Sequence, residues 1–436
     1  MKTLALSLLW ILGVWPLFLF AQKPVSPEDA ALLSQARAVV DTLCSPTMGG
    51  RGYVEEGHLR AATYLANEFE RMGFQPMGDF GEYFQQFSIP LNLATHAELS
   101  LNGAEVEIGQ EFIVNRFTGA GTTEAKVKDL KYGLKSPKSL EGKIALFRSG
   151  FPSHIANNSK KKDRYKNLSR DQQRLEAILA AQPAGAIIVK PKLTLGFTRQ
   201  ALSIPAVEVL DSASPKKVKR ARISVQSQMT TLRSQNVMGM IPGTTNPDSF
   251  LVLTAHYDHL GKLGEAVFPG ANDNASGVAM LLGLMEHFSQ PENQLDYSLL
   301  CIAFGGEETG LVGSRYYVER SQAVPVTKMK FLLNLDLMGN GVDGIMAVGG
   351  KDFPEDFADL ESLNQEIEHP LPRVRARKNA PNSDHFFFLQ AGVPGFFIYT
   401  EGGPKHYHDV HDIPTHLQLS RFVEVRELLI RFLQTR

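Results

Sequence analysis

The C-terminal half of the chain alternates short, almost purely apolar runs with longer amphipathic stretches. The apolar runs have the length and composition of strands that are buried on both faces. They cover 250–255, 298–304 and 331–335. The amphipathic stretches predict helices over 277–288, 311–319 and 422–433. Because strands and helices alternate, we expect an α/β fold with a mixed, largely parallel sheet flanked by helices.

The rest of the chain shows two other patterns. Residues 26–74 predict helix, with apolar side chains on one face between His58 and Met72 and a stop at Gly73. Residues 93–233 instead contain short alternating segments separated by turn residues, which predicts a small β-rich domain. A basic run at 160–170 lies inside this segment. No aromatic ladder accompanies it, so we interpret it as a solvated loop.

The first 21 residues form a pattern of their own. Met1-Lys2-Thr3 precedes an apolar run from Leu4 to Ala21, and the composition then turns polar. This is typical of an export signal cleaved after a small residue. We therefore expect a signal peptide over 1–21 and an exported product, periplasmic or secreted, without stable membrane insertion after cleavage. The alternative is a membrane anchor formed by the same segment left uncleaved.

The charge and the cysteine content of the chain limit its possible binding partners and metal ligands. The chain has 45 Lys and Arg against 46 Asp and Glu, so its formal charge of −1 argues against a broad nucleic-acid-binding surface. Cys44 and Cys301 are the only cysteines, and they form no CxxC pair. A metal in this protein must therefore be held by imidazoles and carboxylates.

Such side chains stand where the predicted strands end. His256 and Asp258 follow the first apolar run, Glu307 and Glu308 the second, and Asp336 the third. The carboxyl ends of parallel strands meet at one edge of a sheet, so these groups are expected to converge.

Two further groups lie near this edge. Asp273 precedes a predicted helix, and the segment 406–412 is rich in histidine. Zn²⁺ accepts such a mixture of nitrogen and oxygen ligands.

These residues occur in motifs that resemble the exported di-zinc aminopeptidases, in the superfamily of aminopeptidase Y and glutamate carboxypeptidase II. The motifs are Ala255-His256-Tyr257-Asp258-His259, Gly270–Gly277, Phe304–Ser314, Asn334-Leu335-Asp336 and Tyr407-His408…Asp412. Met48–Gly52 and Tyr83–Phe87 resemble the N-terminal part of the family. Residues 93–233 resemble the protease-associated domain inserted in many members. The resemblance implies a peptidase domain over 22–92 and 234–436, interrupted by the insertion at 93–233.

The resemblance also implies two Zn²⁺ and a role for each motif residue. His256 and Asp336 would bind one zinc, Glu308 and His408 the other, and Asp273 would bridge them. Three carboxylate ligands and one hydroxide balance the charge of two Zn²⁺, so a buried site is electrostatically plausible.

The implied reaction is hydrolysis of the N-terminal peptide bond of peptide substrates. Glu307 would act as general base on a water that both metals share. Asp258 would hold the second ring nitrogen of His256. His385, in Ser383-Asp384-His385, would steady the oxyanion; the alternative interpretation is a histidine of the core or one that supports a metal ligand.

Other residues near the motifs are interpreted as bystanders. His259, His406 and His411 are expected to support the ligands or face solvent, rather than bind metal. Asn274-Ala275-Ser276 matches a glycosylation sequon. Because it lies inside the proposed metal loop, Gly270–Gly277, which carries Asp273, we interpret it as a chance match.

Three alternative functions remain open at this point. Glutaminyl cyclases share the scaffold and a Glu-Glu pair. A carboxypeptidase or amidase could use Arg373, Arg375 and Arg377 to bind a substrate carboxylate. A non-enzymatic binding protein is the third alternative, although the five ligand positions and the base position all carry suitable residues. Side-chain specificity and oligomeric state are not predicted.

Overall fold

The computed structural model describes residues 26–135, 137–320 and 323–436. The predicted signal peptide at 1–21 lies outside the described residues. In the described part of the chain, no helix is long and apolar enough to cross a membrane.

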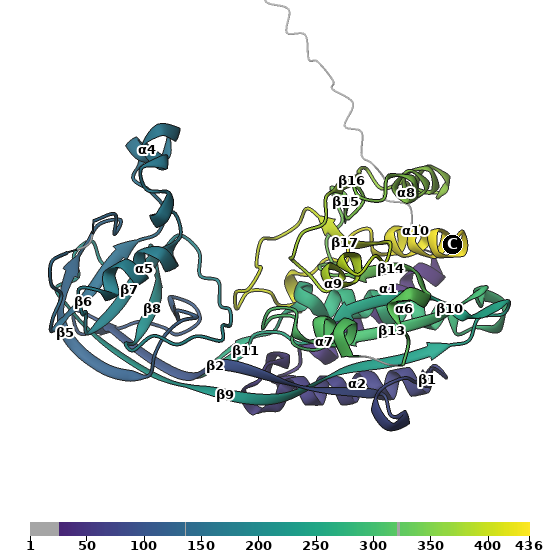
Figure 1. Cartoon of the computed structure of the whole chain (residues 1–436), viewed down its shortest axis with the longest axis horizontal. Helices are drawn as coiled ribbons and strands as arrows, with labels where there is room; N and C mark the ends of the chain where they lie inside the picture. The colour runs from purple at the N-terminus through teal and green to yellow at the C-terminus, as the bar shows by residue number, and fades with distance from the viewer. Residues whose placement is uncertain (1–25, 136, 321–322) are drawn as a thin grey trace, which may run out of the picture.

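The larger of two lobes is built on a mixed sheet with the order β16-β15-β17-β14-β10-β13-β9 (Figure 1). Its strands are β16 (Val374–Arg377), β15 (Gly344–Val348), β17 (Gly395–Glu401), β14 (Met329–Leu335), β10 (Asn246–His256), β13 (Tyr297–Phe304) and β9 (Arg220–Ile241). The central pairs β13–β10, β10–β14 and β14–β17 are parallel, whereas β9 joins β13 antiparallel. The predicted fold, a largely parallel sheet flanked by helices, is confirmed.

Helices cover both faces of this sheet. They are α1 (Pro27–Leu43), α2 (Gly57–Arg71), α6 (Gly277–Phe288), α7 (Val312–Arg320), α8 (Pro354–Glu366), α9 (His385–Gln390) and α10 (Phe422–Gln434). Successive strand residues point to opposite faces. Leu251 and Leu253 of β10 therefore join one core with α1, α2, α6 and α10, while Val252 joins another with α7 and α9. Burial on both faces explains the continuous apolar runs in the sequence.

The smaller lobe contains the predicted β-rich segment (Figure 1). Its strands are β5 (Gly121–Asp129), β6 (Lys143–Arg148), β7 (Gly185–Lys190), β8 (Ala206–Leu210), β4 (Phe112–Val114) and β3 (Ala104–Glu105). Helix α5 (Asp171–Leu179) packs on one face of this sheet through Leu175 and Ile178. The short helices α3 (Ser153–Ala156) and α4 (Ser159–Asp163) project from it, and α4 carries part of the exposed basic run.

A long antiparallel ribbon joins the two lobes. Strand β2 (Phe84–Leu101) pairs with β9 from Phe84 opposite Val237 to Leu101 opposite Ala221. The predicted domain boundaries at 92/93 and 233/234 both fall inside these continuous strands. The division at those residues stays a prediction, but the backbone passes from lobe to lobe as sheet rather than as a flexible linker.

The expectation of helix throughout 26–74 is wrong between α1 and α2. Short 3-10 turns η1 (Pro46–Arg51) and η2 (Val54–Glu56) interrupt it there. Gly49 and Gly50 adopt φ values of +53° and +62°, a left-handed conformation that ends a helix. Remaining short elements are β1 (Gln75–Pro76), η3 (Asp79–Gly81), β11 (Gly261–Leu263), β12 (Ala266–Phe268), η5 (Ala271–Ser276), η4 (Lys166–Leu168), η6 (Pro291–Asn293), η7 (Val326–Lys328) and η8 (Pro414–His416).

Candidate metal centre

The predicted convergence at the carboxyl edge of the sheet is present in the structure. His256 is the last residue of β10 and lies opposite Phe304, the last residue of β13. Glu307 and Glu308 follow in the turn after β13, and Asp336 directly follows β14. Parallel strands in register therefore deliver these side chains to one place.

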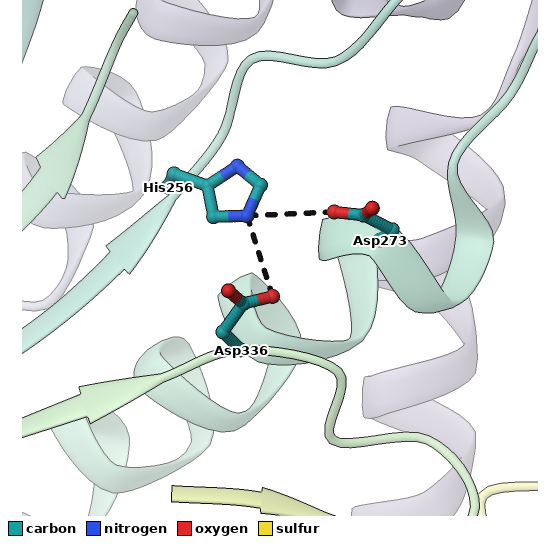
Figure 2. A group of neighbouring side chains, drawn as sticks. All are labelled: His256, Asp273 and Asp336. Carbon is teal, nitrogen blue, oxygen red and sulfur yellow. Dashed lines mark ion pairs between the residues drawn. The ribbon is translucent and has the colours of Figure 1, made fainter. Parts of the chain in front are cut away.

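The first cluster consists of His256, Asp273 and Asp336 (Figure 2). The Nε2 atom of His256 lies 3.4 Å from Asp273 Oδ1 and 3.3 Å from Asp336 Oδ1. All three side chains are buried. Asp273 reaches this position from η5, the turn that precedes α6.

A second cluster uses the same aspartate. His408 Nε2 lies 3.0 Å from Glu308 Oε2 and 3.2 Å from Asp273 Oδ2. His259 Nδ1 contacts Glu308 Oε1 at 2.8 Å and lies 4.0 Å from Asp273 Oδ1. Asp273 thus stands between two groups of nitrogen and oxygen donors, one on each side.

The buried carboxylates of these two clusters need a positive charge to balance them, which a bound cation would supply. Burial disfavours the charged imidazole of His256, but the carboxylates of Asp336 and Glu307 outweigh that effect and raise its pKa well above the usual value. Burial likewise opposes charging of His408, yet Glu308 and Asp273 raise its pKa to about 11. Without an ion, protons on the imidazoles must balance the buried carboxylates.

The hydrogen bonding also fits. His259 Nε2 is a buried atom to which the described residues offer no hydrogen bond, and the buried atoms Asp273 Oδ2 and Asp336 Oδ1 have only the imidazoles of His408 and His256 at 3.2 and 3.3 Å. Such atoms are costly unless something else satisfies them. An N/O donor set of this composition suits Zn²⁺, so the residues present fit a metal of the expected kind.

Asp258 holds the turn that carries the two glutamates. Its carboxylate accepts the backbone N–H groups of Glu307 at 3.1 Å and Glu308 at 3.3 Å, and the Tyr53 hydroxyl at 2.8 Å. His256 Nδ1 lies 3.2 Å from the backbone carbonyl of Asp258 and 4.0 Å from its carboxylate. The carbonyl is therefore the closer partner of the ring, and the carboxylate mainly positions Glu307 and Glu308.

Arg51 ties the metal loop to the end of β10. Its buried guanidinium donates to the carbonyls of Tyr257 at 2.8 Å, Pro269 at 2.6 Å and Gly270 at 2.8 Å, with further bonds to Leu43 and Asp273. The hydrogen-bond acceptors of the Arg51 guanidinium are thus five backbone carbonyl groups rather than a carboxylate. Arg51 therefore fixes the backbone of the loop from Pro269 to Asp273.

The other side of the metal loop is held by Asp412. Its two carboxylate oxygens accept the backbone N–H groups of Asn272 and Asp273, each at 2.9 Å. Asn274 is fully buried and donates to the Leu335 carbonyl at 3.0 Å. Its side chain is part of the core, which agrees with interpreting the sequon as a chance match.

The Ser383-Asp384-His385 motif lies beneath Asp336. The Ser383 hydroxyl donates to Asp336 Oδ2 at 2.8 Å. His385 is fully buried, its ring packs 5.1 Å from that of Phe397, and its ring nitrogens make no hydrogen bond among the described residues. Burial lowers the pKa of His385 to about 3, so the ring is neutral.

The remaining predicted bystanders lie at the rim. His406 and His411 pack ring to ring at 5.8 Å, with His411 exposed. His259, in contrast, is fully buried against Glu308 and lies closer to the clusters than the sequence indicated. A cavity of about 350 Å³ opens beside the site and is lined by Asn272, Leu337 and Tyr407 among others.

The three arginines considered as carboxylate-binding groups lie on or beside β16. Arg375 is paired with Glu401, and Arg377 lies over the ring of Tyr399 at 5.7 Å. Arg373 precedes the strand and supplies its carbonyl to Ile345 N. Arg375 and Arg377 therefore already have partners within the protein.

Several supporting residues were not predicted. Arg51 and Asp412 occur in the family motifs, but the sequence indicates no role for them, nor for Tyr53 or the carbonyl of Leu195. The Gly-Gly-Arg-Gly sequence around Arg51 could have indicated a tight turn near the site. A backbone carbonyl such as that of Leu195 carries no residue-type signal at all.

Comparison with known proteins gives the class of protein. Residues 236–433, which contain all five proposed ligands and Glu307, match peptidase family M28. The match covers the C-terminal part of the chain, and the predicted resemblance to zinc aminopeptidases of this family is confirmed there.

Individual relatives extend the match beyond this region. Aminopeptidase YwaD of Bacillus subtilis is 26% identical over 364 residues, covering 79% of this chain and 73% of YwaD. A glutamate carboxypeptidase 2 homolog of Caenorhabditis elegans is 29% identical over 196 residues, covering 42% of this chain but only 23% of that protein.

Among solved structures, the zinc aminopeptidase BSAP from Bacillus subtilis superposes with a TM-score of 0.69 at 19% identity, covering 92% of this chain and 94% of that one. An aminopeptidase from Aneurinibacillus sp. strain AM-1 gives 0.64 at 19% identity, covering 92% of both. These likenesses show the shared fold of both lobes.

Proposed function

We propose that this protein is an exported, zinc-dependent aminopeptidase that binds two Zn²⁺. His256 and Asp336 would hold one ion, Glu308 and His408 the other, and Asp273 both. The observation that carries the proposal is the position of Asp273, whose two oxygens face separate imidazole–carboxylate groups at 3.2–3.4 Å. The match of residues 236–433 to peptidase family M28 and the peptidase among the relatives support peptide substrates.

The bound ions would acidify a shared water and polarise the scissile carbonyl. Glu307 is the residue of this chain that would move the proton. Burial beside Glu308 raises the pKa of Glu307 well above its usual value, and the neighbouring His256 opposes that shift. A carboxyl with a raised pKa can take a proton from water and return it to the leaving amine.

The fold supports this role by fixing the turn of Glu307 through Asp258. The backbone of the two glutamates is thereby held at the edge where the strands end. His385 is proposed to steady the developing oxyanion. Its neutral ring would do so as a hydrogen-bond donor, not as a cation.

The decisive variant is Glu307→Gln. It keeps the size and shape of the side chain but cannot accept the proton, so we expect turnover to fall roughly 10²- to 10⁴-fold. Zinc should stay at two ions per chain, because Glu307 is not among the proposed ligands. Glu265→Gln, on the exposed turn between β11 and β12, is the matched control and should retain turnover.

The assay compares three kinds of test peptide: aminoacyl, N-acetylated and C-amidated. Cleavage of each is measured with and without a chelator. Cleavage of free N-terminal peptides that is lost with chelator and restored by zinc is the expected result. Near-normal turnover of Glu307→Gln would contradict the assignment of the base. Activity restricted to N-blocked substrates would contradict aminopeptidase specificity.

A further inference from the structure

The loop that carries His408 depends on contacts outside itself. His408 belongs to no helix or strand, and its φ of +59° places it in the left-handed region. A residue other than glycine held there costs on the order of 1 kcal/mol. The conformation that directs His408 Nε2 toward Asp273 and Glu308 therefore needs support from its surroundings.

That support comes from the smaller lobe, in the segment that follows β7. Leu195 N donates to the backbone carbonyl of His408 at 3.1 Å, and the Leu195 carbonyl lies 2.9 Å from His408 Nδ1. A carbonyl can only accept, so Nδ1 carries a proton, which leaves Nε2 as the ring nitrogen that would bind a metal. One residue of the lobe thus fixes both the backbone and the ring of His408.

Lys192, three residues earlier, holds the same loop from its other side. Its ammonium donates to the carbonyls of Lys405 at 2.8 Å and Tyr407 at 2.9 Å, and lies 3.4 Å from Asp409 Oδ2. These contacts bracket His408 on both sides in the sequence. Hydrogen bonds from a charged donor are stronger than neutral ones, so the ammonium is well suited to hold the loop.

The segment itself is anchored in a core that spans both lobes. Leu193 and Leu195 are buried in the apolar cluster of the smaller lobe. The same cluster includes Leu260 and Leu263, which lie just after His259, and packs against Val410. The smaller lobe therefore contacts two segments of the metal centre, the one after His259 and the one that carries His408. It cannot shift without moving both.

We propose that the smaller lobe is a structural part of the metal centre, with Lys192 as a positioning residue for His408. The inference rests on the proposed function for the identity of the metal. It assigns to this lobe the role of setting the affinity of the ion held by Glu308 and His408. Groups that orient a ligand in this way typically change metal affinity 10- to 100-fold when removed.

The test is zinc titration of the full-length, metal-free protein against a competing chelating dye. Lys192→Met keeps the aliphatic stem but removes every donor. We expect it to weaken one of the two zinc sites about tenfold or more and leave the other within about threefold. Lys192→Arg can still donate to the same carbonyls and should restore most of the affinity.

Lys128→Met is the matched control, since Lys128 is exposed on β5 of the same lobe. It should bind zinc as the wild-type protein does. Substitution by Co²⁺ adds a spectroscopic measure, because titration followed by visible absorption should show only one of the two binding steps weakened in Lys192→Met. Thermal unfolding of the metal-free variants shows whether each is folded, and Asp409→Asn is the milder second variant should Lys192→Met not fold.

The outcomes separate the two proposals. Wild-type affinity at both sites in Lys192→Met and Asp409→Asn would overturn the positioning role alone. Tight binding of two zinc ions by a wild-type protein that cleaves no peptide would overturn the proposed function, yet the titration would still test Lys192. An equal loss at both zinc sites would also overturn the inference, because it would indicate a general structural effect.

Discussion

Asp384 is a buried carboxyl close to the metal centre, and its protonation links stability to pH. Burial raises its pKa to about 7, although the charge on His256 opposes the shift. In the unfolded chain an aspartate titrates near 4. Between these two values the folded protein holds a proton that the unfolded chain has lost.

We therefore expect the metal-free protein to lose stability as pH rises from about 4 to about 7, by up to about 1.4 kcal/mol per pH unit from this group. The stabilisation from protonated Asp384 is fully present below pH 4 and is lost as the pH rises through its folded-state pKa of about 7. Asp384→Asn removes this titrating group. Urea unfolding at several pH values should therefore show that the free energy of unfolding falls less steeply with pH in the variant than in the wild-type protein. Asp248→Asn, at a highly exposed position, should keep the wild-type slope. Identical slopes in all three proteins would contradict the raised pKa.

At this scale the sequence predicted the side chains that converge, but not those that hold them in place. His256, Glu308 and Asp336 could be predicted because each follows an apolar strand. The role of Arg51 could not, because its partners are carbonyl groups, which every residue possesses. Leu195 has the same limitation, since only its backbone touches His408.

Among the elements, buried strands and regular helices were the most predictable. Helix α6 spans Gly277–Phe288, as its apolar pattern indicated, and β14 ends at Leu335 as expected. The ribbon of β2 and β9 was not foreseen, because it pairs residues more than a hundred positions apart. The turn at η1 was missed because a helical pattern continues on both sides of it.

Gly52, directly after η1, lies where two backbone segments approach so closely that a side chain does not fit. A Cβ atom at Gly52 would lie 2.3 Å from the Cα of Gly261 and 2.6 Å from its backbone nitrogen. Backbone atoms cannot move aside as a flexible side chain can. The turn that carries Arg51 and the strand that follows His259 therefore meet at a distance only glycine permits.

Gly52→Ala is expected to destabilise the protein by about 1–3 kcal/mol, the usual cost of overpacking. Gly283→Ala is the contrasting control. Its new methyl would meet atoms no closer than 3.6 Å, inside helix α6. That substitution should stabilise by about 0.5–1 kcal/mol, since alanine favours helix over glycine. Urea unfolding of the two variants measures both effects, and a neutral Gly52→Ala would contradict the close approach.

For the molecule as a whole, the two lobes share one apolar core across their junction. Phe268, at the end of β12 in the larger lobe, is buried in the same cluster as Ile223 and Val225 of β9. The ribbon of β2 and β9 continues through both lobes without a break. Shared burial and shared strands together predict that the lobes unfold as one cooperative unit.

Phe268→Ala tests this coupling. Removing a buried phenylalanine typically costs 3–5 kcal/mol through lost burial and the cavity that remains. If the lobes are one unit, the whole unfolding transition moves to lower denaturant and stays single. Coincident curves from intrinsic fluorescence and far-UV circular dichroism would show this. Phe80→Ala, at a fully exposed position, should leave the transition unchanged. Two separate transitions, of which Phe268→Ala moves only one, would mean that the smaller lobe unfolds independently of the metal centre it contacts.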